Sequence, residues 1–474
     1  MKDERPGSME LAIKDLLIAT GGRLLRGSPD AVVRNVSIDS RSVKKGDFFF
    51  AIKGERFDGH DFVKEVYGSG AAGALVEERR ASGVLAFTGE EFIVIAVPDT
   101  IRALGDAAGF WRKASGVLLV AIGGSSGKTT TKDMAAAILE KKMSVLKTRG
   151  NMNNLVGLPL TLFSIEKTHQ AVVAELGISV EGEMTRLVSI ARPDAAVITN
   201  IGRAHLEGFK DMEGVATEKL KLFEAIKADG TIAINMDDPL LSGVAKRYCA
   251  RKITFGKAPG ADVRISSVTA RDFFVQVDYE VWGKSLIVEF DSPSVVNAWN
   301  GAAAISATLP FGVTPDDIKE GLGSFHQPSG RMKVLELGTW TVIDDTYNAN
   351  PDSVAAALKS LSLMNGRRVA ILGDMFELGA SEAALHKEAG ACATRLGIDI
   401  VVAIGKSAVF VKEGAIEGGM NEKDVHAFDN NAGAMEKLSS ILKDKDVVLV
   451  KGSRSAKTEE IMEAMSALAK NKKG

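Results

Sequence analysis

Short apolar runs that end near a glycine recur along this chain, and they constrain its fold more than any other feature. Continuous apolar runs, unlike alternating ones, are typical of parallel strands that are buried on both faces. Amphipathic segments such as 132–141 lie between them and indicate helices that cover the sheets. We therefore expect an α/β fold with mainly parallel sheets in the middle and C-terminal thirds. The runs are VLLVAI before Gly123, VVAEL before Gly177, AAVITNI before Gly202, RRVAIL before Gly373, IVVAI before Gly405 and DVVLV before Lys451-Gly452.

The chain of 474 residues is long enough for two to four domains. In its first hundred residues the apolar runs are shorter and are separated by closely spaced Gly and Asp residues, which indicates a small mixed α/β module. A boundary near Pro98 fits, because 99–113 has the pattern of a helix that leads into the next strand. Residues 261–290 alternate and predict antiparallel strands attached to the middle domain, and a second boundary fits near 327–330. The prediction is three domains, residues 1–98, 99–326 and 327–474.

Composition excludes several classes of protein. Hydrophobic residues make up 45% and charged residues 25%, as in an ordinary globular protein, which argues against a disordered chain. No run approaches the roughly 18 apolar residues of a membrane span, and residues 1–10 lack the apolar core of a signal peptide. A net charge of −2 argues against a nucleic-acid coat, and Cys249 and Cys392 form no metal or redox spacing. We expect a monomer in the cytoplasm.

The sharpest local motif is Gly124-Ser125-Ser126-Gly127-Lys128-Thr129, directly after the run 117–122 and at the start of a helical pattern. Glycines let backbone N–H groups turn towards phosphate oxygens, and a helix N-terminus adds positive potential. The lysine can reach the outer phosphates and the threonine hydroxyl can bind Mg²⁺. Ile122 stands where the longer phosphate-loop pattern has its first glycine, so only the shorter form is present. A Ser/Gly-rich turn is the alternative, but the strand–loop–helix context favours a nucleotide site.

Two further residues lie where apolar runs end and could hold the metal that a triphosphate needs. Glu175 ends the run 172–175, at the sheet edge where doubly wound folds bind ligands. His205 follows the run 195–201. A solvated carboxylate at the rim and a surface histidine are the alternatives for these two residues.

Further motifs follow one another in a fixed order along the chain: Asp39-Ser40-Arg41, Gly54, Asp58-Gly59-His60, Gly124 to Thr130, Gly150 to Asn154, Gly157 to Thr161, Glu175-Leu176-Gly177, Thr199 to Gly202, Ala204-His205-Leu206, Ser329 to Met332, Asp344 to Ser353, Leu372 to Met375, Glu377-Leu378-Gly379 and Lys451 to Arg454. The chain resembles the ATP-dependent muramyl ligases of peptidoglycan synthesis over nearly its whole length. Tyr347 to Ser353 and Gly373-Asp374-Met375 look like the member that adds D-alanyl-D-alanine, and the Asp-Asn-Pro-Arg motif of the preceding ligase is not found in this sequence.

This resemblance implies a fold and a reaction. An N-terminal module would hold a UDP-sugar, a central P-loop-type ATPase domain would bind ATP, and a C-terminal Rossmann-like domain would close over the nucleotide. The reaction would join D-alanyl-D-alanine to UDP-N-acetylmuramoyl-tripeptide through an acyl phosphate. Its products would be ADP, phosphate and UDP-N-acetylmuramoyl-pentapeptide, and its cofactors ATP and two Mg²⁺ ions.

The resemblance also implies residue roles. Lys128 would contact the β- and γ-phosphates, Thr129 and Glu175 would hold one Mg²⁺, and His205 with a carbamylated Lys219 would hold a second. The residues expected to bind ATP are Gly124, Ser125, Ser126, Gly127, Lys128, Thr129, Thr130, Asn300, Arg331 and Asp345. The residues expected to bind the other substrates are Ser40, Arg41 and His60 for the UDP-sugar, together with Asn154, Tyr347 and Asn350. Lys451 and Arg454 would help to bind the dipeptide or cap a helix.

Some alternatives remain open at this point. Lys219 and Lys221 lie ~200° apart on a helix, so only one can face a metal, and the resemblance selects Lys219. Lys221 stands where the family often has Glu, and Val296 where it often has His. A folylpolyglutamate-type ligase would not need the N-terminal module, and a nucleotide-switch ATPase would hydrolyse ATP without the other substrates. The sequence leaves open whether the tripeptide ends in diaminopimelate or lysine.

Overall fold

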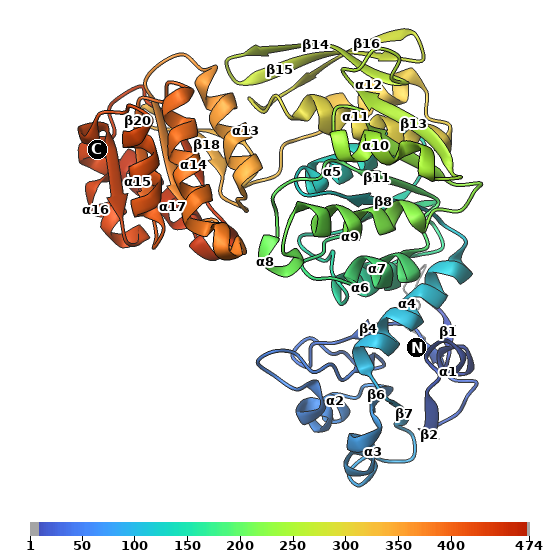
Figure 1. Ribbon diagram of the computed structural model, residues 1–474. Helices are drawn as coiled ribbons and strands as arrows, with labels where there is room; N and C mark the ends of the chain where they lie inside the picture. The colour runs from blue at the N-terminus through green and yellow to red at the C-terminus, as the bar shows by residue number, and fades with distance from the viewer. Residues whose placement is uncertain (1–8, 472–474) are drawn as a thin grey trace.

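The computed structural model describes residues 9–471, which form three α/β units in chain order (Figure 1). The N-terminal residues on which the lack of a signal peptide was predicted lie largely outside this range. The central unit lies between the other two, with the N-terminal unit below it and the C-terminal unit to its left in the view of Figure 1. Within residues 9–471, no helix is long and apolar enough to cross a membrane.

The N-terminal unit is built on a five-stranded sheet in the order β2-β7-β6-β5-β4. Its strands are parallel except for β2, which pairs antiparallel with β7. Apolar clusters lie on both faces of the sheet. The elements are β1 (Leu11–Ala12), α1 (Ile13–Thr20), β2 (Arg23–Arg26), β3 (Val32–Val33), β4 (Val36–Ser37), β5 (Phe48–Phe50), α2 (Val63–Gly68), β6 (Gly73–Glu77), α3 (Glu78–Leu85) and β7 (Ile93–Val97).

Helix α4 (Thr100–Ser115) leads into the central unit, as its sequence pattern predicts. The Asp99 carboxylate caps its start by accepting from the Arg102 amide at 2.9 Å, and Gly116 ends it in the left-handed conformation. The helix packs against α1 and α6, so it belongs to the contact between the first two units.

The central unit holds a nine-stranded sheet in the order β16-β15-β14-β13-β12-β11-β8-β10-β9. The strands from β9 to β14 are parallel, and β14–β16 are antiparallel as their alternation predicts. Helices α5, α11 and α12 cover one face, and α4, α6, α7 and α9 cover the other. The elements are β8 (Leu118–Gly123), α5 (Lys128–Leu139), β9 (Val145–Lys147), α6 (Gly157–Phe163), β10 (Ala171–Glu175), α7 (Glu183–Ala191), β11 (Ala195–Ile198), α8 (Leu206–Phe209), α9 (Met212–Glu224), β12 (Thr231–Asn235), α10 (Pro239–Val244), β13 (Arg251–Gly256), β14 (Val263–Arg271), β15 (Phe274–Val281), β16 (Lys284–Phe290), α11 (Asn297–Thr308) and α12 (Pro315–Gly323).

The C-terminal unit holds a six-stranded sheet in the order β17-β18-β22-β19-β20-β21, parallel except for the edge strand β17. Helices α13, α14 and α15 cover one face, and α16 and α17 cover the other. The α/β class with mainly parallel sheets is thus confirmed. The elements are β17 (Lys333–Leu337), β18 (Trp340–Asp345), α13 (Pro351–Ser362), β19 (Arg368–Gly373), α14 (Glu382–Arg395), β20 (Ile400–Ile404), α15 (Ala408–Glu417), β21 (Val425–Phe428), α16 (Asn431–Ile441), β22 (Val447–Lys451) and α17 (Glu459–Asn471).

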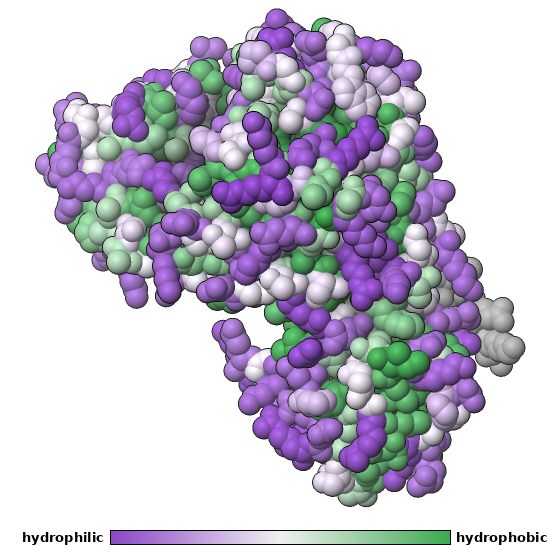
Figure 2. All heavy atoms as spheres, turned by 45° about the vertical axis from the view of Figure 1, so that its right-hand side comes forward, coloured by the Kyte–Doolittle hydropathy of each residue, from purple (hydrophilic) through white to green (hydrophobic). Residues whose placement is uncertain are grey.

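Strand order brings the chemically active chain segments together. Strands β10 and β11 flank β8, so the carboxyl ends of all three meet at one edge of the central sheet. In the C-terminal sheet, β18 and β22 are neighbours and end together, with Asp345 beside Lys451. The space-filling view shows the molecule hollowed where the N-terminal unit meets the rest, with many hydrophilic residues around the hollow (Figure 2).

Candidate active site

Two cavities open on the phosphate loop, one from each side. The larger has a volume of about 1150 Å³ and lies between the N-terminal and central units. The smaller, of about 440 Å³, lies between the central and C-terminal units. Thr129, Arg331 and Tyr347 line both cavities, so the two spaces meet at the start of α5. This arrangement can hold two ligands whose ends approach each other.

The phosphate loop has the conformation that its glycines predict. Gly124 and Gly127 have φ values of 138° and 77°, which favour glycine. A Cβ on Gly127 would lie 2.3 Å from the Asn300 Oδ1, so the loop has no room for a side chain there. The Lys128 ammonium folds back over the loop and donates to the Gly124 carbonyl oxygen at 2.9 Å. Burial lowers the pKa of Lys128, so an anion in the cavity would stabilise its charge.

Oxygen donors that suit Mg²⁺ lie directly beside this loop. The Thr129 hydroxyl donates to the Glu175 carboxylate at 2.7 Å, and the Asn153 amide donates to its other oxygen at 2.8 Å. Glu175 is buried, which excludes the solvated-rim alternative. Among the described residues, no group of three or more His, Cys, Asp and Glu could enclose a metal ion. The oxygen atoms of Thr129, Asn153 and Glu175 could supply part of the ligand shell of a hard cation.

Lys219 and Lys221 of α9 meet different surroundings. Lys219 is 2% exposed, and burial, with a smaller effect from Lys128, lowers its pKa well below the ordinary range. Lys221 pairs with the Glu218 carboxylate at 2.5 Å. The buried Glu218 also accepts from the backbone amides of Gly182 and Met184. Lys219 is therefore a desolvated amine, and the alternative of two solvated lysines is wrong.

His205 lies in the loop between β11 and α8 and lines the smaller cavity. It has a φ of 56°, which is unusual for a residue with a side chain. Its Nδ1 contacts the carboxylate of Glu377, which belongs to the C-terminal unit. The structure thus brings His205 to the same cavity as Lys128, Thr129 and Glu175.

Helix α11 packs against the phosphate loop and the start of α5. Asn297 and Asn300 are buried, which excludes the alternative of a solvated helix face. The Thr131 hydroxyl donates to the Asn300 Oδ1 at 3.4 Å, and the Asn297 amide donates to Gln327 at 3.3 Å. Both asparagines line the smaller cavity.

The C-terminal unit contributes an ion pair that the sequence does not reveal. Lys451, 2% exposed, donates to the Asp345 carboxylate at 2.5 Å and to the Asn348 carbonyl oxygen at 3.0 Å. Its ammonium thus holds the end of β18 and the loop that follows, in addition to lining the cavity. The Arg331 guanidinium lies over the Tyr347 ring, 4.0 Å from its centre. Arg331 therefore stacks on an aromatic ring, which differs from the surface ion pair that was the alternative for this residue.

Asn154 and Asn350, which were predicted to bind substrate, both accept hydrogen bonds from backbone amides at the start of a helix. The Asn154 Oδ1 accepts from the Gly157 amide at 2.9 Å, at the start of α6. The Asn350 side chain accepts from the Ser353 amide at 2.8 Å and caps α13. Both residues nevertheless line the smaller cavity, so capping and ligand contact are compatible.

The three residues predicted to bind the UDP-sugar do not line either cavity. Arg41 is exposed and pairs with Asp39 at 2.7 Å, and Ser40 is next to it. His60 is buried, with Nδ1 2.6 Å from the Asp58 carboxylate and Nε2 accepting from the Glu77 amide at 2.9 Å. Both ring nitrogens therefore have partners inside the N-terminal unit.

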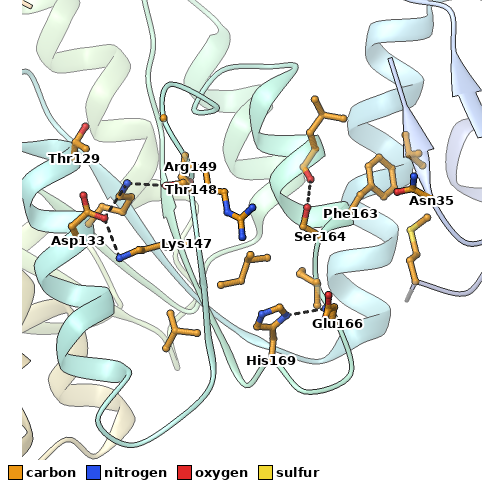
Figure 3. Close-up of a pocket in the computed structure, with 18 of the residues that line it drawn as sticks. Asn35, Thr129, Asp133, Lys147, Thr148, Arg149, Phe163, Ser164, Glu166 and His169 are labelled. Carbon is orange, nitrogen blue, oxygen red and sulfur yellow. Dashed lines mark hydrogen bonds and ion pairs between the residues drawn. The ribbon is translucent and has the colours of Figure 1, made fainter. Parts of the chain in front are cut away.

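The larger cavity has basic and polar side chains from both of its walls. Asn35 donates to the Asp47 carboxylate at 2.8 Å, and the neighbouring Lys45 also lines the space. Lys147 and Arg149 line it from the central unit (Figure 3). No motif marks these residues, and only the pairing of β4 with β5 shows that Asn35 lies beside Asp47.

The sequence matches three domain families: "Mur ligase family, catalytic domain" over residues 32–112, "Mur ligase middle domain" over 122–308 and "Mur ligase, glutamate ligase domain" over 330–454. UDP-N-acetylmuramoyl-tripeptide–D-alanyl-D-alanine ligase from Bacillus subtilis is 33% identical over 91% of this chain and 93% of its own. MurF from Acinetobacter baumannii superimposes with a TM-score of 0.89 at 31% identity, over 97% of this chain and 100% of its own. MurF ligase from Thermotoga maritima in complex with ADP superimposes with a TM-score of 0.83 at 29% identity, over 93% of this chain and 99% of its own.

Proposed function

This chain belongs to the Mur ligase family, and from that premise we propose that it is an ATP-dependent ligase that joins D-alanyl-D-alanine to UDP-N-acetylmuramoyl-tripeptide. The observation that carries the proposal is the meeting of two cavities at Thr129. One cavity would hold ATP and the other the UDP-linked peptide, with the γ-phosphate and the terminal carboxylate where they meet. The choice of substrates is supported by the Bacillus subtilis ligase, whose similarity to this chain extends over more than nine-tenths of both proteins.

The reaction needs activation of a carboxylate, because a carboxylate does not acylate an amine at neutral pH. A carboxylate oxygen attacks the γ-phosphorus, the bond from phosphorus to the β–γ bridging oxygen breaks, and ADP leaves. The amine of D-alanyl-D-alanine then attacks the acyl phosphate, phosphate leaves, and the amine loses a proton. The first step brings several negative charges together, so the protein must supply cations and hydrogen-bond donors. Lys128 and the backbone amides of its loop fill that role.

We propose the following nucleotide contacts. Lys128 holds the β- and γ-phosphates, and Asp345 accepts from the ribose hydroxyls at the end of β18. Arg331 and Tyr347, stacked on each other, line the cavity on the side of the C-terminal unit. The structure of the ADP complex of a relative supports the nucleotide class.

The donor set beside the loop fits the expected Mg²⁺. Thr129 and Glu175 would hold one ion, and His205 with Lys219 as a carbamate would hold a second. Bound Mg²⁺ would offset the negative charge of the phosphates. Burial lowers the pKa of Lys219, so its ammonium form is disfavoured at this position. Attack of the amine on CO₂, with release of a proton, would replace that cation with an anionic carbamate. An anionic carbamate offers oxygens, which Mg²⁺ prefers over an ammonium.

The UDP-sugar would occupy the larger cavity, where Arg34, Lys45 and Arg149 offer positive charge. Ser40, Arg41 and His60 remain predictions for this ligand. The monomeric state and the cytoplasmic location also remain predictions.

One experiment tests the function as a whole. Phosphate release is measured with ATP, UDP-N-acetylmuramoyl-tripeptide and D-alanyl-D-alanine, and again with each omitted, and products are identified by mass spectrometry. We expect sustained release only with all three and a product heavier by the dipeptide. Equal release with ATP alone would contradict the proposal and favour a nucleotide switch. Offering the diaminopimelate and lysine forms of the tripeptide identifies the preferred one.

A further inference from the structure

The loop that carries His205 belongs to the central unit but is held by the C-terminal unit. The Arg203 amide donates to the Asp352 carboxylate at 2.7 Å, and the Arg203 Nε donates to the same group at 2.9 Å. The Arg203 Nη1 also donates to Glu388 at 2.7 Å. A Cβ on Gly202 would lie 2.6 Å from the Asp352 carboxylate, so the two units are in close contact here.

Glu377 fixes the same loop at His205 itself. Its carboxylate contacts the His205 Nδ1, and its backbone oxygen accepts from the Glu207 amide at 3.1 Å. Leu206, between them, packs against the apolar core of the C-terminal unit. A left-handed backbone at His205 is unfavourable for a residue with a Cβ, so these contacts stabilise a conformation that the loop would not favour alone.

The contact with Glu377 determines which ring nitrogen carries the proton. The Glu377 carboxylate lies against the His205 Nδ1, and a carboxylate has no proton to donate, so it can only accept in this contact. The Nδ1 of His205 must therefore donate, and the neutral ring then has its lone pair on Nε2. Among the described residues, none forms a hydrogen bond with that Nε2, and the ring lines the smaller cavity.

We propose that Glu377 is a positioning residue for His205: the C-terminal unit sets the tautomer and orientation of a histidine that the central unit supplies to the phosphate cavity. The proposal rests on the proposed function insofar as His205 acts as a ligand. A carboxylate that accepts from the far nitrogen of a metal-binding histidine fixes its ring and raises its basicity. Here that carboxylate comes from another domain, so His205 becomes a competent ligand only when the two units are docked.

The first measurement reports the tautomer and needs neither ligation nor a metal. The protein is labelled with ¹⁵N-histidine and bound to ADP, and two-bond ¹H–¹⁵N spectra are recorded at a pH where histidine is neutral. His205→Gln identifies the signals. We expect the proton on Nδ1 in the wild type and in Glu377→Gln, whose amide oxygen still accepts. Glu377→Ala should move it to Nε2, the tautomer that free histidine prefers.

A matched control variant distinguishes an effect of Glu377 on His205 from a general weakening of the contact between the two units. Glu388 also contacts the loop from the C-terminal unit, and its side chain is 50% exposed against 52% for Glu377. Glu388→Ala removes such a contact without touching His205. The second measurement is the affinity of each ADP complex for Mn²⁺, followed by electron paramagnetic resonance of the free ion.

Glu377→Ala should weaken Mn²⁺ binding by roughly 10- to 100-fold, whereas Glu377→Gln and Glu388→Ala should stay near the wild type. Retention of the Nδ1 proton in Glu377→Ala, unchanged Mn²⁺ affinity, or an equal loss in Glu388→Ala would overturn the proposal. Because the spectra do not depend on turnover, a protein that fails to ligate but shows the expected tautomers would refute the proposed function alone.

Discussion

At the scale of single residues, the surroundings of a side chain decide its chemistry. Lys219 and Lys221 are the same amino acid two positions apart, yet one is a desolvated amine and the other the counter-ion of a buried carboxylate. Helical geometry predicts that they face different ways. It cannot predict that Glu218, next to Lys219, turns inward to accept from the Gly182 and Met184 amides, because that contact depends on how α7 packs on α9.

Removal of the Lys219 side chain should abolish most ligation. We expect Lys219→Ala to lose most activity and small carboxylates such as acetate to restore part of it, since they can replace the carbamate oxygens. Lys221→Ala should remain active. It should lower the free energy of unfolding by about 1–3 kcal/mol, because Glu218 loses a charged donor. Steady-state rates and urea denaturation check both variants, and an inactive Lys221→Ala beside an active Lys219→Ala would reverse the assignment.

The ammonium of Lys128 should matter for catalysis and not for folding. Lys128→Ala removes a charge from the loop and little apolar contact, so we expect ligation to fall by roughly 100-fold or more. Circular dichroism and the thermal midpoint should remain close to the wild type. Turnover at the wild-type rate would show that the lysine does not contact the transferred phosphate.

At the scale of elements, the sequence predicts what depends on neighbouring positions along the chain. The apolar runs correctly predict the parallel strands, and the alternation over 261–290 predicts the antiparallel β14–β16. The contact of Lys451 with Asp345 is not predictable in this way. It needs β22 to lie beside β18 in matching register, although 106 positions separate the two residues. The roles assigned to individual site residues remain predictions.

The turn before α5 should be intolerant of any side chain. Gly127→Ala combines a φ of 77° with a Cβ 2.3 Å from Asn300, so we expect loss of ATP binding and lower stability. Gly116→Ala is the matched control, with a φ of 65° and open space around the added methyl group. The control should cost about 1–2 kcal/mol of stability from backbone strain and keep ATP binding. Calorimetric titration with ADP measures nucleotide binding, and chemical denaturation measures the free energy of unfolding, in both variants. Equal effects of the two substitutions would show that the contact of the added methyl group with Asn300 is not the cause.

At the scale of the whole molecule, the C-terminal unit docks on the central one through further contacts besides those of Glu377, and two of them lie apart from each other. One is the contact of Arg203 with Asp352 and Glu388. The other is the turn between β14 and β15, where Asp272 accepts from the Asn365 amide at 3.1 Å. Phe273 of the same turn packs against the apolar core of the C-terminal unit. The docked arrangement therefore depends on contacts at both ends of the interface, outside the cavity itself.

Loss of the first contact should favour an open molecule. Arg203→Ala removes charge-assisted hydrogen bonds worth about 1.5–3 kcal/mol, so the KM for ATP should rise by roughly 10- to 100-fold. Small-angle scattering should show a larger radius of gyration for the variant than for the wild type, with the difference reduced by nucleotide and UDP-sugar together. Identical scattering curves and an unchanged KM would show that this contact does not hold the units together.

The wall shared by the two cavities also has a consequence for inhibitor design. Because Thr129, Arg331 and Tyr347 line both cavities, a single compound could extend from one cavity into the other without displacing part of the protein. Tethering two weak fragments makes the second attachment intramolecular, and the short path between the chambers keeps its effective concentration high. Such a two-armed compound should bind this enzyme more tightly than it binds ATP-binding proteins that have no second cavity beside the nucleotide.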